Sequence, residues 1–242
     1  MATNSRLASL LIAVVISSWG CSYHYVAGPL QPSEDQGEGM KIADDGSLTF
    51  VRGRLEVSLR PMTDDELDRQ VSANGEVSPY TYGDIVFDDG IVRSRFTVFR
   101  LKVKNYEFPK VIIDPTQIEL VAANGRRYWS LNHQQLVTYF RTYAVGYRGN
   151  EHGDFQERIG LLNRTMFKSD AVFSGQELDG YIVFPVLHND VGSVEVVVHG
   201  AALRFDYRGV PLETVDIGYR LQRDIRRKSW RESPRQTASI AE

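Results

Sequence analysis

Cysteine is almost absent from this sequence, since Cys21 is the only one among 242 residues. The chain can therefore form no internal disulfide, which fits either a reducing cytosol or an exported protein that folds without crosslinks. An excess of positive charge is absent too, because the formal net charge is −3. A nucleic-acid binder normally presents a basic face, so we expect no nucleic-acid partner.

Motifs for the common classes of enzyme chemistry are also missing. The sequence contains no Gly-x-Ser-x-Gly nucleophile turn and no phosphate-binding loop. Its histidines belong to no zinc-binding motif; they are His24, His133, His152, His188 and His199. Glu151, His152 and Asp154 lie together, and we interpret them as a solvated turn rather than a catalytic pair. We therefore predict no catalytic residue, no metal site and no cofactor, although a triad assembled in space leaves no trace in sequence spacing.

Residues 1–20 have the three parts of an export signal. Arg6 supplies the positive charge, Leu7 to Ile16 form an apolar run of ten residues interrupted only by Ser9, and small residues lead to Gly20. A helix needs about 20 apolar residues to cross the hydrocarbon core of a bilayer. The run is too short for that, so we expect a cleaved signal.

The end of this segment resembles the lipid-attachment site of bacterial lipoproteins. Gly20 and Cys21 match the family pattern, whereas Ser18 and Trp19 stand where the family has an aliphatic and a small residue. The resemblance implies cleavage after Gly20, acylation of Cys21 by palmitate-type chains, and membrane attachment through this lipid. Ser22, in place of Asp, implies the outer membrane of a Gram-negative cell, on its periplasmic face or at the surface. An ordinary secretory signal or an uncleaved anchor remains the alternative.

The remaining chain divides into a linker, a β domain and a tail. Residues 21–47 are rich in Gly, Pro and acidic side chains and predict a flexible linker. Residues 223–242 are basic and predict a disordered tail, with contact to anionic lipid headgroups or to an acidic partner as the alternative. Between them, residues 48–222 predict a mainly β domain.

Alternating apolar and polar residues carry the β prediction. In Arg95 to Asn105, Thr97, Phe99, Leu101 and Val103 share one side. Asn124-Gly125 predicts a hairpin with a type I′ turn. Several such strands without a βαβ rhythm indicate an antiparallel sandwich. Thr63 with Glu66 predicts a capped helix over Asp64 to Gln70.

Three short segments resemble bacterial extracytoplasmic immunoglobulin-like domains. They are Val98 to Asn105, a strand that ends in Asn; Ile118 to Tyr128, a strand, turn and strand; and Ser174 to Phe184, a turn and a strand. The resemblance implies an antiparallel immunoglobulin-like sandwich. Such domains are accessory modules of lipoproteins, mostly without assigned activity.

Residues 132–168 interrupt the β pattern and predict an inserted α-helical hairpin. Asn132 with Gln135 forms a capping box, and an apolar stripe follows at helical spacing. The stripe either covers an open face of the sandwich or offers side chains to a partner. The candidate contacts in the hairpin are Tyr139, Tyr143, Tyr147, Arg141 and Arg148.

A long loop between strands carries Tyr80 and Tyr82. Loops of this length are often functional, so both tyrosines are candidate partner contacts; the favoured alternative is that they pin the loop to the domain.

These features favour three functions, in descending order. The first is a lipid-anchored cell-envelope protein that acts as a non-catalytic structural or protein-interaction module, with another envelope protein as its partner. The second is a ligand-binding lipoprotein whose helical hairpin and Tyr-rich loop form a groove. The third is an envelope hydrolase.

Overall fold

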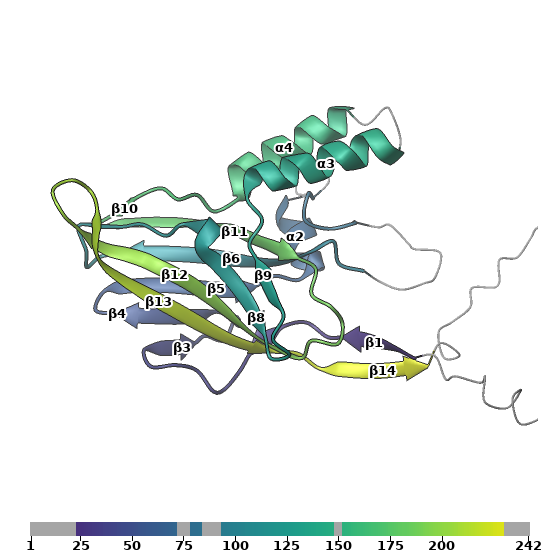
Figure 1. Cartoon of the computed structure of the whole chain (residues 1–242), viewed down its shortest axis with the longest axis horizontal. Helices are drawn as coiled ribbons and strands as arrows, with labels where there is room; N and C mark the ends of the chain where they lie inside the picture. The colour runs from purple at the N-terminus through teal and green to yellow at the C-terminus, as the bar shows by residue number, and fades with distance from the viewer. Residues whose placement is uncertain (1–22, 72–77, 84–92, 148–151, 230–242) are drawn as a thin grey trace, which may run out of the picture.

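A computed structural model describes residues 23–71, 78–83, 93–147 and 152–229 of the chain (Figure 1). Cys21, Gly20 and Arg148 lie outside these residues. The described part consists of two five-stranded sheets packed face to face and a layer of helices outside one of them.

The first sheet has the strand order β11-β6-β5-β4-β3. Its strands are β11 (Gln176–Pro185), β6 (Phe96–Asn105), β5 (Leu55–Pro61), β4 (Leu48–Arg52) and β3 (Met40–Ile42). The second sheet has the order β2-β13-β12-β8-β9. Its strands are β2 (Gln31–Pro32), β13 (Pro211–Gln222), β12 (Ser193–Phe205), β8 (Ile118–Ala122) and β9 (Arg127–Trp129).

Smaller elements complete the described structure. Two short ribbons pair β7 (Lys110–Val111) with β10 (Val172–Phe173), and β1 (Tyr23–Ala27) with β14 (Ile225–Ser229). The helices are α2 (Asp64–Val71), α3 (His133–Tyr147), α4 (His152–Thr165) and the 3₁₀ helix η2 (Pro115–Gln117). Neighbouring strands in both sheets run antiparallel, so the prediction of a mainly β, antiparallel fold is confirmed.

The core lies between the two sheets and follows the predicted alternation. Phe99, Leu101 and Val103 point inward from β6 and are completely buried. Tyr219 of the opposite sheet is also buried, and its hydroxyl donates to the backbone oxygen of Val57 at 2.8 Å. This hydrogen bond links the two sheets inside the apolar core, where an unpaired hydroxyl would be costly.

Asn105 ends β6 and holds the chain around it. Its side-chain amide donates to the backbone oxygens of Phe108 and Val172, each at 2.8 Å. Its carbonyl oxygen accepts from the backbone nitrogens of Glu107 and Phe108 at 3.2 and 2.9 Å. A fully buried amide is thereby satisfied, and the strand is joined to the β7–β10 ribbon.

The turn at Asn124-Gly125 connects β8 and β9, but the predicted type I′ geometry is wrong. Gly125 has a φ of 84°, whereas no non-glycine residue that the structure describes has a positive φ. The backbone nitrogen of Gly125 donates to the oxygen of Ala122 at 2.8 Å. This is a three-residue loop in which one left-handed glycine follows a tight turn.

The flexible linker predicted over residues 21–47 is corrected from Tyr23 onward, because β1, β2 and β3 lie within it. The backbone nitrogen of Ser33 donates to the oxygen of Arg220 at 3.0 Å, and Leu30 and Met40 pack against the core. The tail predicted over residues 223–242 is corrected up to Ser229, since β14 falls within it; residues 230–242 lie outside the described structure. These short strands are held mainly by backbone hydrogen bonds, which a low-hydrophobicity composition does not reveal.

Both ends of the helical hairpin are joined to the edge of β11. Before α3, the backbone nitrogen of Leu131 donates to the oxygen of Val183 at 2.7 Å. After α4, the nitrogen of Phe167 donates to the oxygen of Tyr181 at 3.0 Å. The chain passes so close here that a Cβ on Gly180 would lie 2.5 Å from the nitrogen of Phe167.

Replacement of Gly180 by alanine should therefore destabilise the domain. We expect Gly180→Ala to lower the free energy of unfolding by about 2 kcal/mol, because backbone atoms must shift to admit the methyl group. Gly160→Ala is the matched control: Gly160 lies in α4 with no atom near its Cβ position, and alanine there should stabilise by up to about 1 kcal/mol. Urea unfolding of both variants measures the difference, and equal effects would contradict the close approach.

Candidate interaction site

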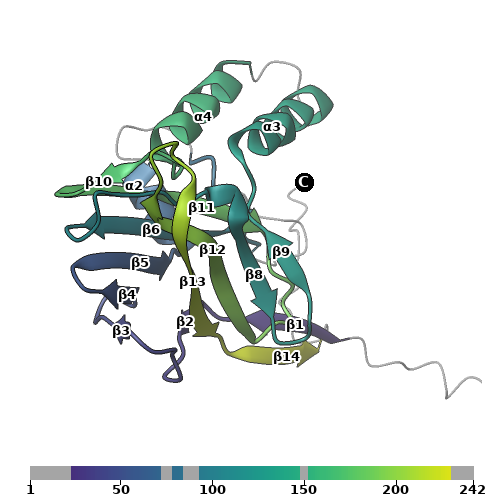
Figure 2. The ribbon, with the colours of Figure 1, turned by 60° about the vertical axis from the view of Figure 1, so that its left-hand side comes forward.

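The helices cover one end of the outer face of the first sheet, as Figure 2 shows. Leu67 of α2, Leu136 and Phe140 of α3, and Leu161 and Leu162 of α4 form a second apolar cluster. They pack on side chains that project outward from the sheet: Phe96, Val98, Tyr181 and Val183. The apolar stripes of the hairpin therefore serve the covering role that was one of the two predicted interpretations.

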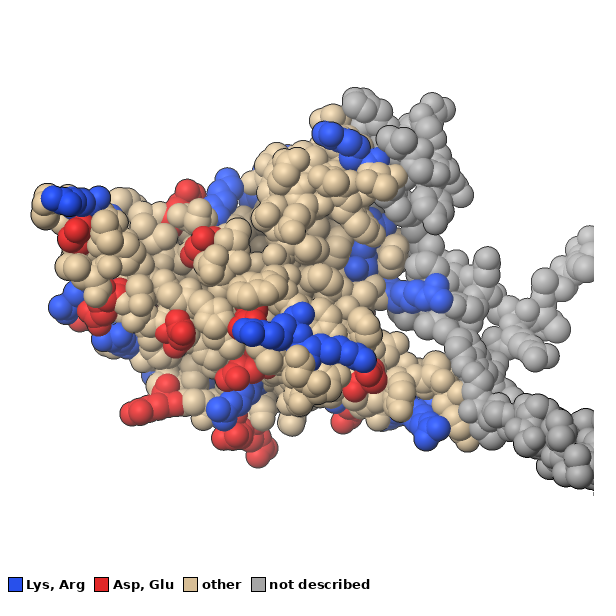
Figure 3. All heavy atoms as spheres, viewed as in Figure 1, with Lys and Arg blue, Asp and Glu red and all other residues tan. Residues whose placement is uncertain are grey.

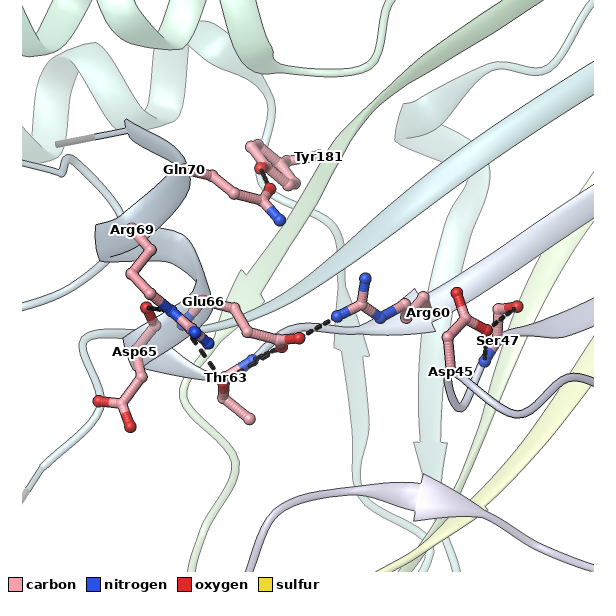
Figure 4. A network of polar contacts seen from close by, with 9 residues as sticks. All are labelled: Asp45, Ser47, Arg60, Thr63, Asp65, Glu66, Arg69, Gln70 and Tyr181. Atoms are coloured by element: carbon pink, nitrogen blue, oxygen red, sulfur yellow. Dashed lines mark hydrogen bonds and ion pairs between the residues drawn. The ribbon is translucent and has the colours of Figure 1, made fainter. Parts of the chain in front are cut away.

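Polar contacts fix α2 beside this cluster (Figure 4). The backbone nitrogen of Thr63 donates to the carboxylate of Glu66 at 3.0 Å, and the Thr63 hydroxyl accepts from the backbone nitrogen of Glu66 at 3.3 Å. The predicted capping box is thus confirmed. Arg60 of β5 pairs with the same carboxylate, and Tyr181 of β11 donates to the side chain of Gln70. The helix is tied at both ends to strands of the first sheet.

Tyr80 is buried, so the prediction that it contacts a partner is wrong. Its exposed fraction is 0%, and its ring lies edge-to-face on Tyr181 with 5.2 Å between the centroids. Its hydroxyl is hydrogen-bonded to that of Thr165 at 2.5 Å, and burial raises the pKa of the phenol. Tyr80 therefore pins its loop to α4, which is the alternative that the sequence favoured.

Tyr82 and Tyr139 belong to one group of side chains that contains two largely buried arginines, Arg95 and Arg158. The guanidinium of Arg95 lies 4.6 Å from the ring centroid of Tyr82 and 5.4 Å from that of Phe140. Arg158 of α4 approaches the same Phe140 ring at 5.8 Å. We call this group the arginine–aromatic cluster; its members are Tyr82, Arg95, Phe96, Tyr139, Phe140 and Arg158.

Tyr139 is the exposed part of the arginine–aromatic cluster. Its ring contacts Phe96 and Phe140, each with 5.1 Å between centroids, yet 36% of the residue remains accessible. Arg141 is exposed two residues further along α3, on another side of the helix. The side chains of Tyr143 and Tyr147 and the whole of Arg148 lie outside the described structure. Among the candidate contacts, the structure therefore links Tyr82 to Tyr139 through Arg95 and Phe140.

A separate hollow of about 250 Å³ lies where the hairpin joins the sandwich. Its walls come from η2 and the chain before α3, from the end of α4, and from β11; they include Thr116, His133, Leu162, Met166 and Tyr181. The Nε2 atom of His133 is buried there with no hydrogen-bond partner. None of the lining residues belongs to the Tyr-rich loop, so the hollow differs from the predicted groove.

A cluster of charged side chains that the sequence analysis missed lies on the outer face of the second sheet. Glu119 of β8 is only 2% exposed. It accepts from Arg127 Nε at 2.7 Å and from Arg127 Nη2 at 2.5 Å, and it contacts His199 Nε2 at 2.7 Å. His199 Nδ1 also lies 3.5 Å from Asp216.

The hydrogen bonds from Arg127 hold the pKa of the Glu119 carboxyl below its ordinary value of 4.5, although burial acts in the opposite direction. The pairing of Glu119 with Arg127 depends on the three-residue loop, which places Arg127 opposite Val121, two positions from Glu119 on the same face. The predicted two-residue turn would have placed the two side chains on opposite faces. His199 was not accessible from the sequence, because it reaches Glu119 only through the pairing of β12 with β8.

Within the described residues, no group of three or more His, Cys, Asp or Glu side chains is placed to hold a metal ion. Of the helices in that part of the chain, none combines the length and apolar character needed to span a bilayer.

Comparison with known proteins does not identify a family for this chain. No protein-family model matches the sequence, and no curated protein matches it. Among solved structures, the chain is similar to MPT63, a secreted protein from Mycobacterium tuberculosis, with a TM-score of 0.31 and 10% sequence identity. The match covers 66% of this chain and 90% of that chain. A TM-score of this size does not indicate a shared fold, and nothing about the site follows from it.

Glu119 should make stability depend on pH in the acid range. The pKa of Glu119 is lower in the folded state than its ordinary value of 4.5. Its contribution to the free energy of unfolding is therefore complete above pH 4.5 and is lost as the pH falls through the pKa of the folded state. We expect Glu119→Gln to lower the free energy of unfolding by roughly 2 kcal/mol near pH 7 and by much less near pH 3.

Urea unfolding at the two pH values measures this difference. Glu195→Gln is the control, because the Glu195 side chain is 43% exposed and its ion pair with Arg220 contributes little. If Glu119→Gln lowers the free energy of unfolding equally at both pH values, the lowered pKa of Glu119 in the folded state is contradicted.

Proposed function

We propose that this protein is a lipid-anchored module of the bacterial cell envelope that binds another envelope protein and catalyses no reaction. The observation that carries the proposal is the arginine–aromatic cluster with Tyr139 at its surface. Tyr and Arg are enriched among the residues that dominate binding energy at protein interfaces.

The cluster is well suited to binding because its members are held in place before a partner arrives. Arg95 is 6% exposed and Arg158 is 9% exposed, and their guanidinium groups lie near the ring of Phe140. Phe96 and Phe140 in turn contact the ring of Tyr139. A partner that packs on Tyr139 therefore meets a rigid aromatic edge, which lowers the entropy lost on association.

The membrane attachment rests on residues 1–21. The charged start, the short apolar run and Gly20-Cys21 support a lipoprotein signal, and the lipid on Cys21 would hold the domain at the outer membrane. Ser22 supports the outer membrane over the inner one, by the resemblance to Gram-negative sorting.

The non-catalytic character is supported by the Glu119 cluster, which contains the histidine and carboxylates closest to a catalytic arrangement. Both oxygens of Glu119 accept hydrogen bonds from Arg127, and both nitrogens of His199 face carboxylates, Nε2 at 2.7 Å from Glu119 and Nδ1 at 3.5 Å from Asp216. A general base needs a free nitrogen that faces a nucleophile. A hydrolase is therefore the least supported function.

Ligand binding in the hollow is the second candidate function. It is favoured by the His133 Nε2 atom, which is buried without a hydrogen-bond partner beside a mostly apolar wall. Such a site fits a small apolar molecule with one hydrogen-bonding group. It lies at a different place from the groove that was predicted between the helical hairpin and the Tyr-rich loop.

The lipid anchor predicts acylation that depends on Cys21. Cells that express the full chain and receive labelled fatty acid should incorporate label into the wild type and not into Cys21→Ser, because serine cannot form the thioether to the lipid. Label of equal strength in both chains, or in neither, would exclude the lipoprotein assignment.

The partner surface predicts position-dependent crosslinking in native membranes. A photo-crosslinking residue at Thr142, which is exposed one turn after Tyr139 on α3, should give a discrete product with an envelope protein, and this product should be lost when Tyr139→Ala is added. The control position is Tyr207, which is 88% exposed in the connection between β12 and β13. Equal products at both positions, or a product unaffected by Tyr139→Ala, would contradict the proposed surface.

A further inference from the structure

We infer that the β1–β14 ribbon is a second membrane-binding element that contacts anionic phospholipid headgroups directly. The inference rests on the proposed lipid anchor for the orientation of the ribbon and extends it to a surface that the anchor alone does not explain. Figure 1 shows the ribbon projecting from one corner of the sandwich. Its strand β1 begins at Tyr23, the first residue that the structure describes.

The charge of the ribbon is of one sign. β14 contains Arg226, Arg227 and Lys228, and neither strand contains Asp or Glu. This contrasts with the whole chain, whose formal net charge is −3. Figure 3 shows basic side-chain atoms on the ribbon at the lower right of the molecule. The nearest acid in the sequence is Asp224, which precedes β14.

Two exposed tyrosines accompany these bases. Tyr23 is 43% exposed and Tyr25 is 44% exposed, although β1 is a paired strand. The guanidinium of Arg227 lies 4.0 Å from the ring centroid of Tyr23. Tyrosine beside Arg and Lys is the combination that proteins place at the level of lipid headgroups, because the ring is amphipathic and the cations meet phosphate.

The foot of the ribbon is fixed to the sandwich. Arg223 donates through Nε to the backbone oxygen of Val191 at 2.7 Å and through Nη2 to that of His188 at 2.5 Å. After the other strand, Leu30 packs against the core and Pro32 pairs with Leu221 of β13. The ribbon is therefore attached to the domain through both strands, and its orientation relative to the sandwich is defined.

The position of the proposed lipid brings the ribbon to the membrane. Tyr23 follows Cys21 by two residues, and an extended chain spans at most about 3.6 Å per residue. The first residue of β1 therefore lies within about 7 Å of the acylated residue. A domain anchored at Cys21 cannot keep this ribbon away from the headgroups, so its basic and aromatic side chains meet them.

The test uses unacylated protein, so that binding by the ribbon is separated from binding by the lipid. Residues 22–242 contain every residue that the structure describes, and they are mixed with vesicles of phosphatidylcholine alone or with added phosphatidylglycerol. Sedimentation should show binding that requires phosphatidylglycerol and weakens at high salt. The triple variant Arg226→Gln, Arg227→Gln, Lys228→Gln should bind about 100-fold more weakly.

A matched triple variant controls for the loss of charge. Lys110→Gln, Arg204→Gln and Arg208→Gln remove the same charge from β7 and from the β12–β13 hairpin, which lies at the opposite end of the sandwich from the ribbon (Figure 1). This variant should bind vesicles like the wild type. Circular dichroism spectra check that each variant is folded.

Three results would overturn the inference: no binding to vesicles that contain phosphatidylglycerol, equal binding to phosphatidylcholine alone, or an equal loss in both triple variants. Failure of the lipid anchor gives a different pattern. In that case fatty acid label is absent from the full chain, while residues 22–242 still bind the anionic vesicles through the ribbon.

Discussion

The burial of β6 on both of its faces is the constraint on which this architecture depends. Phe99, Leu101 and Val103 point into the sandwich, whereas Phe96 and Val98 point out of it at the beginning of the same strand. Each such side chain gains roughly 1.5–3 kcal/mol from burial. A two-layer sandwich would leave the second set in water, so the domain needs a third layer, and the inserted hairpin supplies it.

The alternation and capping patterns explain which features were predictable. The strand at Arg95 to Asn105, the capping box at Thr63 and the helical insertion all follow from local spacing, because side-chain period and helix capping depend on neighbours in the chain. The arginine–aromatic cluster was predictable only in its parts. Tyr82 and Tyr139 were candidates, but Arg95 and Arg158 join them through packing between distant elements.

The features that were not predictable arise from long-range pairing. β1 and β2 are short, and they are strands because β14 and β13, which are distant in the sequence, pair with them. The hydrogen-bond partner of Tyr80 was not predictable either, since Thr165 reaches its hydroxyl from another element. The contact of His199 with Glu119 depends in the same way on the register between β12 and β8.

The correction of the linker changes how the domain relates to its anchor. A flexible tether would let the domain sample many orientations above a membrane. A β1 strand paired with β14 instead joins the two ends of the described chain in one ribbon. For a protein anchored at Cys21, this restricts which faces of the sandwich point away from the lipid surface and are available to a partner.

The two backbone contacts between the hairpin and β11 have a further consequence. β11 is the outermost strand of its sheet, and an uncovered outer strand offers unpaired backbone groups that can template the addition of a strand from another molecule. Leu131 and Phe167 occupy the oxygens of Val183 and Tyr181 along this edge. The inserted hairpin therefore also blocks edge-to-edge self-association through β11. A sandwich without the hairpin would lack this protection.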